Sequence, residues 1–438
     1  MKGKFNLQTL LYVNIRDYKV ERVKPIYAAK KLGYRIALMA DEDPGLDAGL
    51  IDDLILVDTY DMEESVKASV KYSKSHTIVG VLTWSDKDVE LVAKIGSELG
   101  LHTMSVEAAK RARNKYVMRD ALSHVPEICP KYKRVISFDD LKQAVNEVGT
   151  PGIFKPVGGA GSKGIFKVED DTDIRELYDI MIESASPDND KIFTYYPNEY
   201  IYEEYLEGPE ISVDGVVQNN TVFITGVADN LVSDDYSLDY FEIFPSEKDD
   251  ETVGNIKKCT EIAVKKLGFN NCSFHLEARF TPDGFKVIEV AGRPAGGFLA
   301  SHVFEHASGH SYLEFIIKVA VGEDIRDSWR DFDKNSNQSV CHYEILADKE
   351  GVITDIRGLD DVMEDEDIIL IIPVKQIHDE VVLPPKDFES SYLATAVVSG
   401  NGYEDIMNTI NRMESKLKYR IVKKIEGNLL KKEEWALK

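Results

Sequence analysis

The sequence GIFKPVGGAGSKGIFKVED, residues 152–170, carries the strongest local signal in the chain. Its glycines Gly159, Gly161 and Gly164 follow the pattern G-x-G-x-x-G, which alone is a weak indicator. Strand-like residues flank the loop on both sides, whereas a dinucleotide-binding loop runs from a strand into a helix. A serine precedes Lys163, so the loop is not a Walker A loop either. We therefore predict a glycine loop that closes a β-hairpin.

A glycine loop on a β-hairpin can lay backbone N–H groups over the phosphates of a nucleotide, as in protein kinases. Lys155, on the incoming strand, would add a positive charge beside a phosphate. An ordinary flexible hairpin is the alternative that the loop alone leaves open. The nucleotide-binding candidates in this stretch are Lys155, Gly159, Gly161, Ser162 and Gly164.

A second candidate segment is YEEYLEGPE, residues 202–210, which follows a strand-like run. A short segment of this kind can present alternating backbone donors and acceptors to the edge of an adenine ring. Glu210, about one turn later, is suited to binding both ribose hydroxyls. An acidic, solvated strand end is the alternative interpretation.

The sequence HLEARFTPDGFKVIEVAGRPAGG, residues 275–297, predicts a hairpin that turns at Pro282-Asp283-Gly284. Glu277 and Glu289 lie on its two arms, where they could share one face. Two converging carboxylates repel each other unless a cation lies between them. Mg²⁺, or Mn²⁺ in its place, takes hard oxygen ligands and shares the remaining positions with ATP phosphates. The alternative, two surface glutamates, is weakened by the apolar residues that flank both.

The first part of the chain, about residues 1–110, alternates strand-like and helix-like stretches. This alternation predicts a parallel, doubly wound sheet. Ligands bind at the carboxyl ends of the strands of such sheets, here near Asn14, Asp41 or Trp84-Ser85-Asp86. No G-x-G-x-x-G follows the first strand, so a dinucleotide role for this domain is a poor fit.

Later residues carry dense strand signals with glycine-rich turns, which predict antiparallel sheets in an α+β unit. The polar stretch of residues 326–339 reads as a linker. Residues 340–438 again mix strands with a helix at about 403–417.

The chain has 438 residues, 53 basic and 77 acidic side chains and a net charge of −24. This charge disfavours binding to nucleic acid or to an anionic membrane, because both require clusters of lysine and arginine. Four scattered cysteines without a C-x-x-C motif favour a reducing compartment, and the N-terminus does not read as a signal peptide. We expect a cytoplasmic protein with small-molecule partners, and a homodimer is the oligomeric state we consider.

Three signals occur in a fixed order: the lysine strand with its glycine loop, the E-E-Y-L-E-G-x-E segment, and the hairpin with paired glutamates. Together they resemble the ATP-grasp superfamily of carboxylate–amine ligases, and within it the bacilysin-type L-amino acid ligases, which synthesise dipeptides. The tail R-P-A-G-G after the second glutamate and the C-terminal unit of roughly a hundred residues fit that group. The resemblance implies a two-subdomain nucleotide-binding core between a doubly wound N-terminal domain and a C-terminal α+β domain. The implied domains are 1–110, 111–200 with the glycine loop, 201–330 with the metal strands, and 340–438.

The resemblance also implies roles for individual residues. Lys115, in RARNKYVMRD, would be the first nucleotide lysine and Lys155 the second. Arg293, four residues after Glu289, would steady an acyl-phosphate. The residues implied to line adenine are Glu203, Glu204, Tyr205 and Leu206, with Glu210 on ribose and with Glu277 and Glu289 on Mg²⁺.

One position departs from the family pattern. The second metal strand usually reads E-x-N, but here Ala291 stands where asparagine is expected and cannot bind a cation. One of two Mg²⁺ ions would then be lost, weakly held or completed by another group. His275 lies two residues before Glu277 and so on the same strand face, where it could help to neutralise phosphate. A buried structural histidine is the alternative.

The implied reaction is ATP-dependent: a carboxylate forms an acyl-phosphate, and an amine then displaces the phosphate. An amino acid as first substrate would make the product a dipeptide. The alternatives are biotin-carboxylase-like or D-alanine-ligase-like chemistry, or a nucleotide-binding module without catalysis.

Two further sequence patterns indicate other candidate sites. Residues His302 to His306 match H-x-x-E-H, the inverted zinc-peptidase pattern, although five-residue matches are frequent by chance. The acidic, aromatic stretch 229–250 includes Asp234, Asp235 and Glu242, which could hold a substrate ammonium group. An amphipathic helix and a solvated excursion are the respective alternatives.

Overall fold

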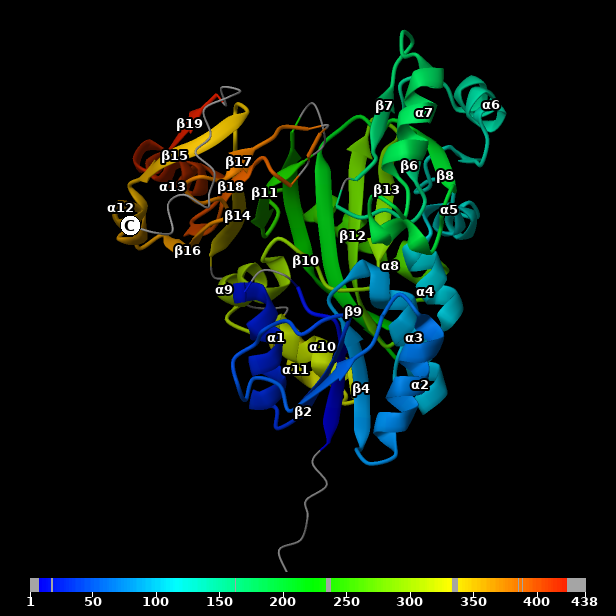
Figure 1. The fold of residues 1–438 in the computed structure, drawn as a ribbon, viewed down its shortest axis with the longest axis vertical. Helices are drawn as coiled ribbons and strands as arrows, with labels where there is room; N and C mark the ends of the chain where they lie inside the picture. Colours follow the sequence, from blue (N-terminus) through cyan, green and yellow to red (C-terminus); the bar gives the residue numbers. More distant parts are fainter. Residues whose placement is uncertain are drawn as a thin grey trace, which may run out of the picture. The chain divides into compact units, whose positions relative to one another are not determined.

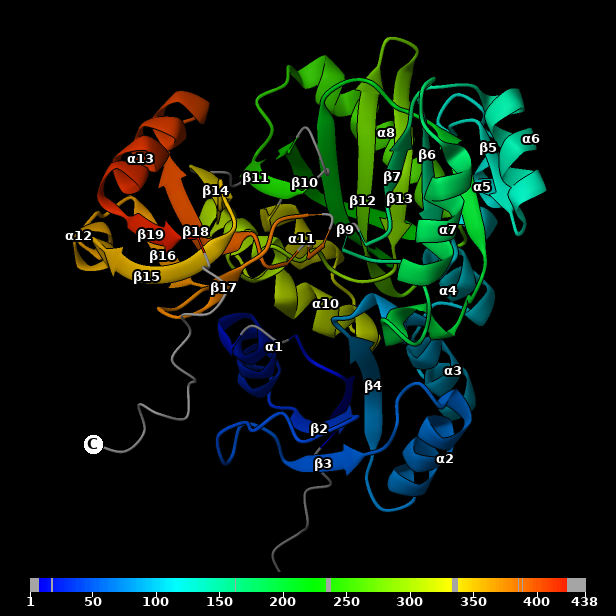
Figure 2. The same cartoon turned by 45° about the horizontal axis from the view of Figure 1, so that its top comes forward.

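The computed structural model describes residues 8–16, 19–161, 163–233, 238–332, 338–384, 386–387 and 389–423. Two compact units make up the chain (Figures 1 and 2). The first comprises Met1–Leu231 and Glu242–Val340, and the second comprises Val232–Phe241 and Cys341–Lys438. Part of the acidic, aromatic stretch therefore belongs to the second unit. The domain boundaries that we placed within residues 1–330 stay predictions, and Ser162, Asp234 and Asp235 lie outside the described residues.

The N-terminal sheet has four parallel strands in the order β3-β2-β1-β4, which confirms the predicted doubly wound arrangement. Its central strands are apolar and buried, as expected when helices cover both faces of a parallel sheet. The strands are β1 (Thr9–Val13), β2 (Arg35–Ala40), β3 (Asp53–Leu56) and β4 (Ile78–Thr83). The helices are α1 (Lys19–Lys31), α2 (Met62–Ser73) and α3 (Val89–Leu99), with a short turn of 3₁₀ helix at Asp86–Asp88.

The glycine-loop region forms a second, antiparallel sheet in the order β5-β8-β6-β7. Strands β6 and β7 pair with each other, so the predicted hairpin around the glycine loop is confirmed. The strands are β5 (Tyr132–Val135), β6 (Gly152–Pro156), β7 (Phe166–Val168) and β8 (Tyr200–Glu204). The helices of this region are α4 (Val106–Arg113), α5 (Lys115–Leu122), α6 (Phe138–Val148) and α7 (Ile174–Ser184).

The third sheet of the first unit contains the predicted glutamate hairpin and runs in the order β13-β12-β9-β10. Its residues alternate, so one face presents apolar side chains such as Val213 and Leu276 to a buried core. The other face is polar. The elements are β9 (Glu210–Gln218), β10 (Thr221–Val232), β12 (Cys272–Thr281), β13 (Gly284–Ala291) and α8 (Asp250–Lys266), which packs against β13.

The segment after β13 is helical for most of its length. A π-helical turn (Leu299–Val303) leads into α9 (Phe304–Ser308), α10 (Tyr312–Ala320) and α11 (Arg326–Phe332). The predicted linker at 326–339 is therefore wrong over its first half. The reason is Trp329, which is buried against Phe223 and Phe315 and anchors the otherwise polar helix.

In its described residues, the second unit contains antiparallel strands and the helices α12 and α13, in agreement with the predicted α+β character. Its elements are β14 (Ser339–Leu346), β15 (Gly351–Arg357), α12 (Leu359–Met363), β16 (Ile368–Pro373), β17 (Glu380–Val381), β18 (Tyr392–Gly400), α13 (Tyr403–Lys416) and β19 (Lys418–Val422), while β11 (Asp239–Phe244) is divided between the units. Over the described ranges of the chain, no helix is both long and apolar enough to cross a membrane.

Candidate active site

The paired carboxylates lie directly opposite each other on the polar face of the third sheet, where Glu277 of β12 pairs with Glu289 of β13. Regular counting from the turn would pair Glu277 with Ile288. A shift of register after Ala278 leaves Ile288 as an extra residue and brings Glu289 opposite Glu277. The shared face that we predicted therefore depends on a β-bulge.

Lys115 reaches the same place from the start of α5. Its Nζ lies 2.9 Å from Oε2 of Glu289 and donates to the carbonyl oxygen of Gly159 in the glycine loop at 3.0 Å. Burial opposes ionisation of Glu289, but Lys115 and Lys155 together lower the pKa of this carboxyl. A cation thus already compensates one of the two carboxylates. The two carboxylate groups would supply hard oxygen donors of the kind that Mg²⁺ requires, since its other positions go to water and phosphate.

His275 lies in the next row of the same face, between Asp214 on β9 and Ala291 on β13. Its Nδ1 is 2.9 Å from Oδ2 of Asp214, and its Nε2 is 3.3 Å from Oε1 of Glu277. Burial lowers the pKa of His275, but Asp214 and Glu277 raise it well above its usual value. The alanine that replaces the expected asparagine therefore lies opposite a buried imidazole whose pKa is raised by two carboxylates.

Lys155, on β6, is buried and forms an ion pair with Glu203, whose Oε2 lies 2.7 Å from its Nζ. Arg119 is fully buried against the same carboxylate, with its Nε 2.7 Å from Oε1. Burial would raise the pKa of Glu203, but Arg119 and Lys155 together lower it. The carboxylate of Glu203 thus holds two cations.

We did not predict a role for Arg119 from the sequence, although it lies in the same segment as Lys115, RARNKYVMRD. The available signal was its spacing, because residues four apart on a helix share a face and Lys115 precedes it by four. Its Nη2 also donates to the carbonyl oxygen of Ile288 at 2.6 Å. Arg119 therefore connects the lysine of the glycine-loop sheet with the bulge that aligns the two carboxylates.

The predicted adenine segment is partly occupied by sheet hydrogen bonds. The amide N–H groups of Glu204 and Tyr205 donate to the carbonyl oxygens of Lys131 and Pro151. Two of the backbone donors that we expected to meet adenine are therefore engaged, because this hydrogen bonding continues one residue past the end of β8. Leu206 lies beyond these bonds, and its carbonyl oxygen accepts from Arg279 at 2.9 Å. Adenine binding by this segment stays a prediction.

Glu210, the predicted ribose ligand, begins β9 and is buried. Its Oε2 lies 3.0 Å from Nη2 of Arg279. Burial and the nearby carboxylate of Glu277 raise the pKa of Glu210 to about 7, despite the opposing effect of Arg279. Arg279 was not anticipated from the sequence, although it shares the strand face of Glu277.

The glycine loop has the backbone geometry that its sequence implied. Gly161 and Gly164 adopt φ values of 65° and 75°, which side chains with a Cβ rarely tolerate. A Cβ added at Gly164 would lie 3.1 Å from the ring of Pro156. The loop therefore requires glycine for its conformation, while phosphate binding by the loop stays a prediction.

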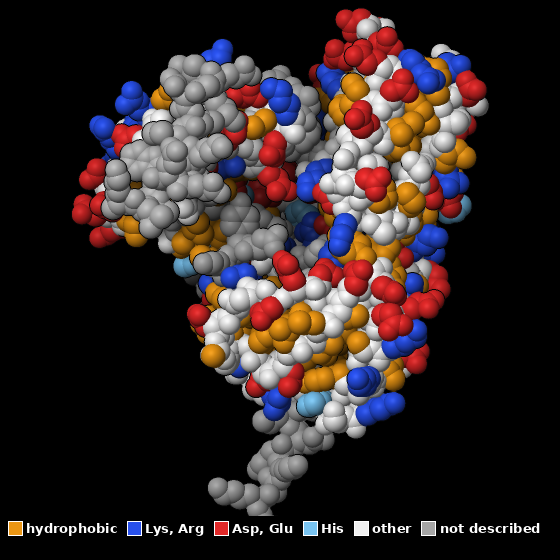
Figure 3. All heavy atoms as spheres, in the orientation of Figure 1, with side chains coloured by type: hydrophobic (Ala, Val, Ile, Leu, Met, Phe, Trp, Pro, Cys, Tyr) orange, Lys and Arg blue, Asp and Glu red, His pale blue; other side chains and the backbone are white. Residues whose placement is uncertain are grey.

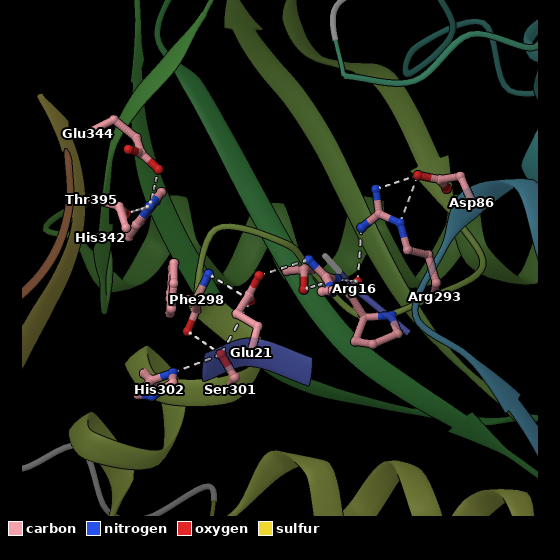
Figure 4. A network of polar contacts seen from close by, with 12 residues as sticks. Arg16, Glu21, Asp86, Arg293, Phe298, Ser301, His302, His342, Glu344 and Thr395 are labelled. Atoms are coloured by element: carbon pink, nitrogen blue, oxygen red, sulfur yellow. Dashed lines mark hydrogen bonds and ion pairs between the residues drawn. The ribbon is translucent and has the colours of Figure 1, made fainter. Parts of the chain in front are cut away.

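Arg293 lies just after the end of β13 and forms an ion pair with Asp86, which follows the carboxyl end of β4 (Figure 4). Its Nη2 and Nε lie 2.6 and 2.8 Å from Oδ2 of Asp86, and its Nη1 donates to the carbonyl oxygen of Pro294. Burial opposes ionisation of Asp86, but Arg293 and Arg113 lower its pKa to about 2. The predicted ligand edge of the N-terminal sheet thus contacts, through this arginine, the segment that follows the glutamate hairpin.

The H-x-x-E-H segment does not have the arrangement of a zinc site. His302 and His306 stack with ring centroids 6.4 Å apart, and Glu305 pairs with Lys24 at 3.3 Å. Burial lowers the pKa of His302 to about 3. Among the residues that the structure describes, no three histidine, cysteine or acidic side chains are grouped to hold a metal ion. The zinc-peptidase alternative therefore lacks support.

A model of the ATP-grasp domain family matches residues 148–302, which include the glycine loop, the adenine segment and the glutamate hairpin. The chain carries an ATP-grasp domain.

Curated relatives of this chain include a ligase and a synthase. Alanine–anticapsin ligase of Bacillus subtilis (strain 168) is 28% identical over 247 residues, which cover 53% of this chain and 52% of that protein. Dapdiamide A synthase of Enterobacter agglomerans is 24% identical over 261 residues, which cover 59% of this chain and 60% of that protein. The chain thus spans about half the length of the curated relatives it matches.

Solved structures share the ATP-grasp fold over almost the whole chain. The crystal structure of an L-amino acid ligase from Bacillus licheniformis has a TM-score of 0.80 at 18% identity and covers 95% of this chain and 99% of its own. Phosphoribosylglycinamide synthetase from Anaerococcus prevotii has a TM-score of 0.69 at 19% identity, covering 95% and 100%. The predicted ATP-grasp fold and the similarity to L-amino acid ligases are confirmed.

Proposed function

We propose that this protein is an ATP-dependent ligase that joins a small-molecule carboxylate to an amine and releases ADP and phosphate. The observation that carries the proposal is the convergence of opposite charges on one sheet face. Glu277 and Glu289 lie opposite each other there, and Lys115 contacts Glu289. Burial lowers the pKa of Arg293, but Asp86 and, to a smaller extent, Glu289 and Glu277 raise it.

In this proposal the lysines offset the negative charge of ATP, and the arginine offsets that of the acyl-phosphate. Lys115 and Lys155 would bind ATP phosphates, and Glu277 and Glu289 would hold Mg²⁺, which when bound offsets charge on the phosphate oxygens. A substrate carboxylate oxygen attacks the γ-phosphorus, and the bond to the β–γ bridging oxygen breaks, so that ADP leaves. Arg293 would bind the resulting acyl-phosphate, because a guanidinium binds phosphoryl oxygens in a fork.

The second step transfers the acyl group to an amine. The amine nitrogen attacks the acyl carbon, the carbon–oxygen bond to phosphate breaks, and the nitrogen loses a proton. Water would compete with the amine, so closure of the glycine loop over the site would protect the acyl-phosphate.

We propose an L-amino acid as the first substrate, which would make the product a dipeptide. Support comes from a relative whose name pairs alanine with anticapsin, and from the whole-chain likeness to the fold of an L-amino acid ligase. We also propose that the protein acts in the cytoplasm, which agrees with the scattered cysteines of the sequence.

A phosphate-release screen tests the proposal. Pairs of L-amino acids are incubated with the protein, ATP and Mg²⁺, and active pairs are examined by mass spectrometry for a product lighter than the summed substrates by one water. Glu277→Gln serves as the matched variant for background ATPase. Tight ATP binding without turnover on any pair would instead favour a nucleotide-binding module without catalysis.

A further inference from the structure

The loop after β13, residues 293–298, forms hydrogen bonds with three charged side chains of the same unit, and Figure 4 shows two of them, Arg16 and Glu21. Arg16, which follows the carboxyl end of strand β1, donates from Nη2 to the carbonyl oxygens of Pro294 and Ala295 at 3.1 and 2.6 Å. Glu21, on α1, accepts from the N–H of Phe298 at 3.2 Å. We call residues 293–298 the arginine loop, because Arg293 begins it.

Asp214, on the central strand β9, provides the third hold. Its Oδ1 accepts from the N–H of Ala295 at 3.1 Å, and its side chain is 1% exposed. Its other oxygen, Oδ2, lies 2.9 Å from Nδ1 of His275, whose Nε2 approaches Glu277 at 3.3 Å. One short, buried carboxylate therefore contacts both the arginine loop and the histidine beside a predicted metal ligand.

We propose that Asp214 is a positioning residue that fixes Arg293 relative to Glu277, by holding the arginine loop with one oxygen and His275 with the other. The inference rests on the proposed ligase function, in which these two side chains must meet one acyl-phosphate and its metal ion. Asp214 itself would contact neither the acyl-phosphate nor the metal ion. Because β9 pairs with β10 on one side and β12 on the other, its backbone is fixed by the sheet, and the carboxylate transmits that fixed position to both partners.

Asparagine at position 214 separates this role from simple packing. The amide has nearly the same shape but only one oxygen, and its NH₂ group cannot accept a hydrogen bond. Ala295 presents an N–H group, and Nδ1 of His275 donates to Asp214 when it carries a proton. Asp214→Asn can therefore keep both contacts only if the imidazole gives up its Nδ1 proton and accepts from the amide. Asp53→Asn is the control for loss of a carboxylate elsewhere, since one oxygen of Asp53 accepts from both Arg35 and Tyr72 at the start of β3, an edge strand of the N-terminal sheet.

Kinetics and hydrogen exchange test the proposal together. Asp214→Asn should keep ATP affinity within about twofold and lower kcat by about 10- to 100-fold, the cost of a small misplacement of a reacting group. In an Arg293→Lys background the same substitution should lower kcat by less than about threefold, because residues that act as one unit are not additive. In the protein alone, peptides covering residues 292–298 should exchange amide hydrogens faster in Asp214→Asn than in the wild type or in Asp53→Asn.

Independent, multiplying effects of Asp214→Asn and Arg293→Lys, with unchanged exchange of the arginine loop, would overturn the proposal. Where Asp214→Asn proves too unstable to assay, His275→Gln interrupts the same connection at its other end, and loss of kcat without loss of ATP affinity is again expected. A wild-type protein without substrate-dependent ATP turnover would refute the proposed function. The exchange experiment would still decide whether Asp214 holds the arginine loop.

Discussion

Arg293 and Asp86 form a partly buried ion pair between residues 207 positions apart in the sequence. Two nitrogens of the guanidinium share one oxygen of Asp86, and the third donates to the carbonyl oxygen of Pro294. The N–H groups of the guanidinium are thereby directed by an ion pair from the N-terminal sheet. The orientation of Arg293 thus depends on two distant parts of the sequence.

Arg293→Lys should keep ATP affinity but lower the rate of product formation by about 10²–10³, as expected when one donor to a developing oxyanion is lost. A lysine has a single nitrogen and cannot contact Asp86 and a phosphoryl oxygen in the same fork. ATP titration and amino-acid-dependent phosphate release on the same preparation provide the measurement. Arg35→Lys, which alters the ion pair with Asp53, is the control. Full activity of a stable Arg293→Lys protein would refute this role.

Glu277→Gln and Glu289→Gln should each remove most turnover while the protein stays folded. Glutamine keeps the volume of the side chain but lacks the charge that Mg²⁺ requires. The measurement is turnover as a function of Mg²⁺ concentration, accompanied by the melting temperature. Glu261→Gln, on the exposed side of α8, is the control because it loses only a surface pair with Lys265. Near-normal activity of either variant would contradict the metal assignment.

Glu203→Gln should destabilise the protein more than Lys155→Met does. Loss of the Glu203 carboxylate leaves two buried cations, Lys155 and Arg119, without their shared partner, at a cost of about 3–5 kcal/mol. Loss of the lysine leaves Glu203 paired with Arg119. Urea unfolding measures the difference, and equal destabilisation would argue against this ion network. Lys155→Met should in addition weaken binding of a non-hydrolysable ATP analogue, which tests the predicted phosphate contact.

The stability of the ligand-free protein should depend on the ionisation of Glu210. Its pKa is about 7 in the folded protein against 4.5 as the ordinary value, so the folded state binds the proton more tightly. Below pH 4.5 both states are protonated. Between about pH 4.5 and 7 the unfolded chain ionises first, so the free energy of unfolding falls as pH rises. The free energy of unfolding of the wild type minus that of Glu210→Gln should therefore decrease as the pH rises from about 4.5 to 7. A difference that stays constant with pH would contradict the prediction.

The glycine-loop hairpin and the parallel N-terminal sheet could be predicted because their signals are local. Strand periodicity, glycine position and the alternation of strands with helices each follow from neighbouring residues. The short helix around Trp329 could not, since it depends on aromatic residues distant in the sequence. Polar composition alone made residues 326–339 resemble a linker.

The candidate site was predictable in its acidic and basic residues but not in its connections. Glu277 and Glu289 share a face only because Ile288 bulges, and Arg119 binds the carbonyl oxygen of that bulge. Asp214 and Asp86 act through partners that are 61 and 207 residues away. Such contacts are created by the fold, and a single sequence does not indicate which loops converge.

The most direct test of the central claim follows one oxygen atom. An active carboxylate substrate, labelled with ¹⁸O in its carboxyl group, is converted with ATP, Mg²⁺ and its amine partner, and the released phosphate is analysed by mass spectrometry. An acyl-phosphate requires that one labelled oxygen pass from the carboxylate to the phosphate. We predict phosphate carrying one ¹⁸O per product formed. Unlabelled phosphate, released at the rate of product formation, would contradict the account.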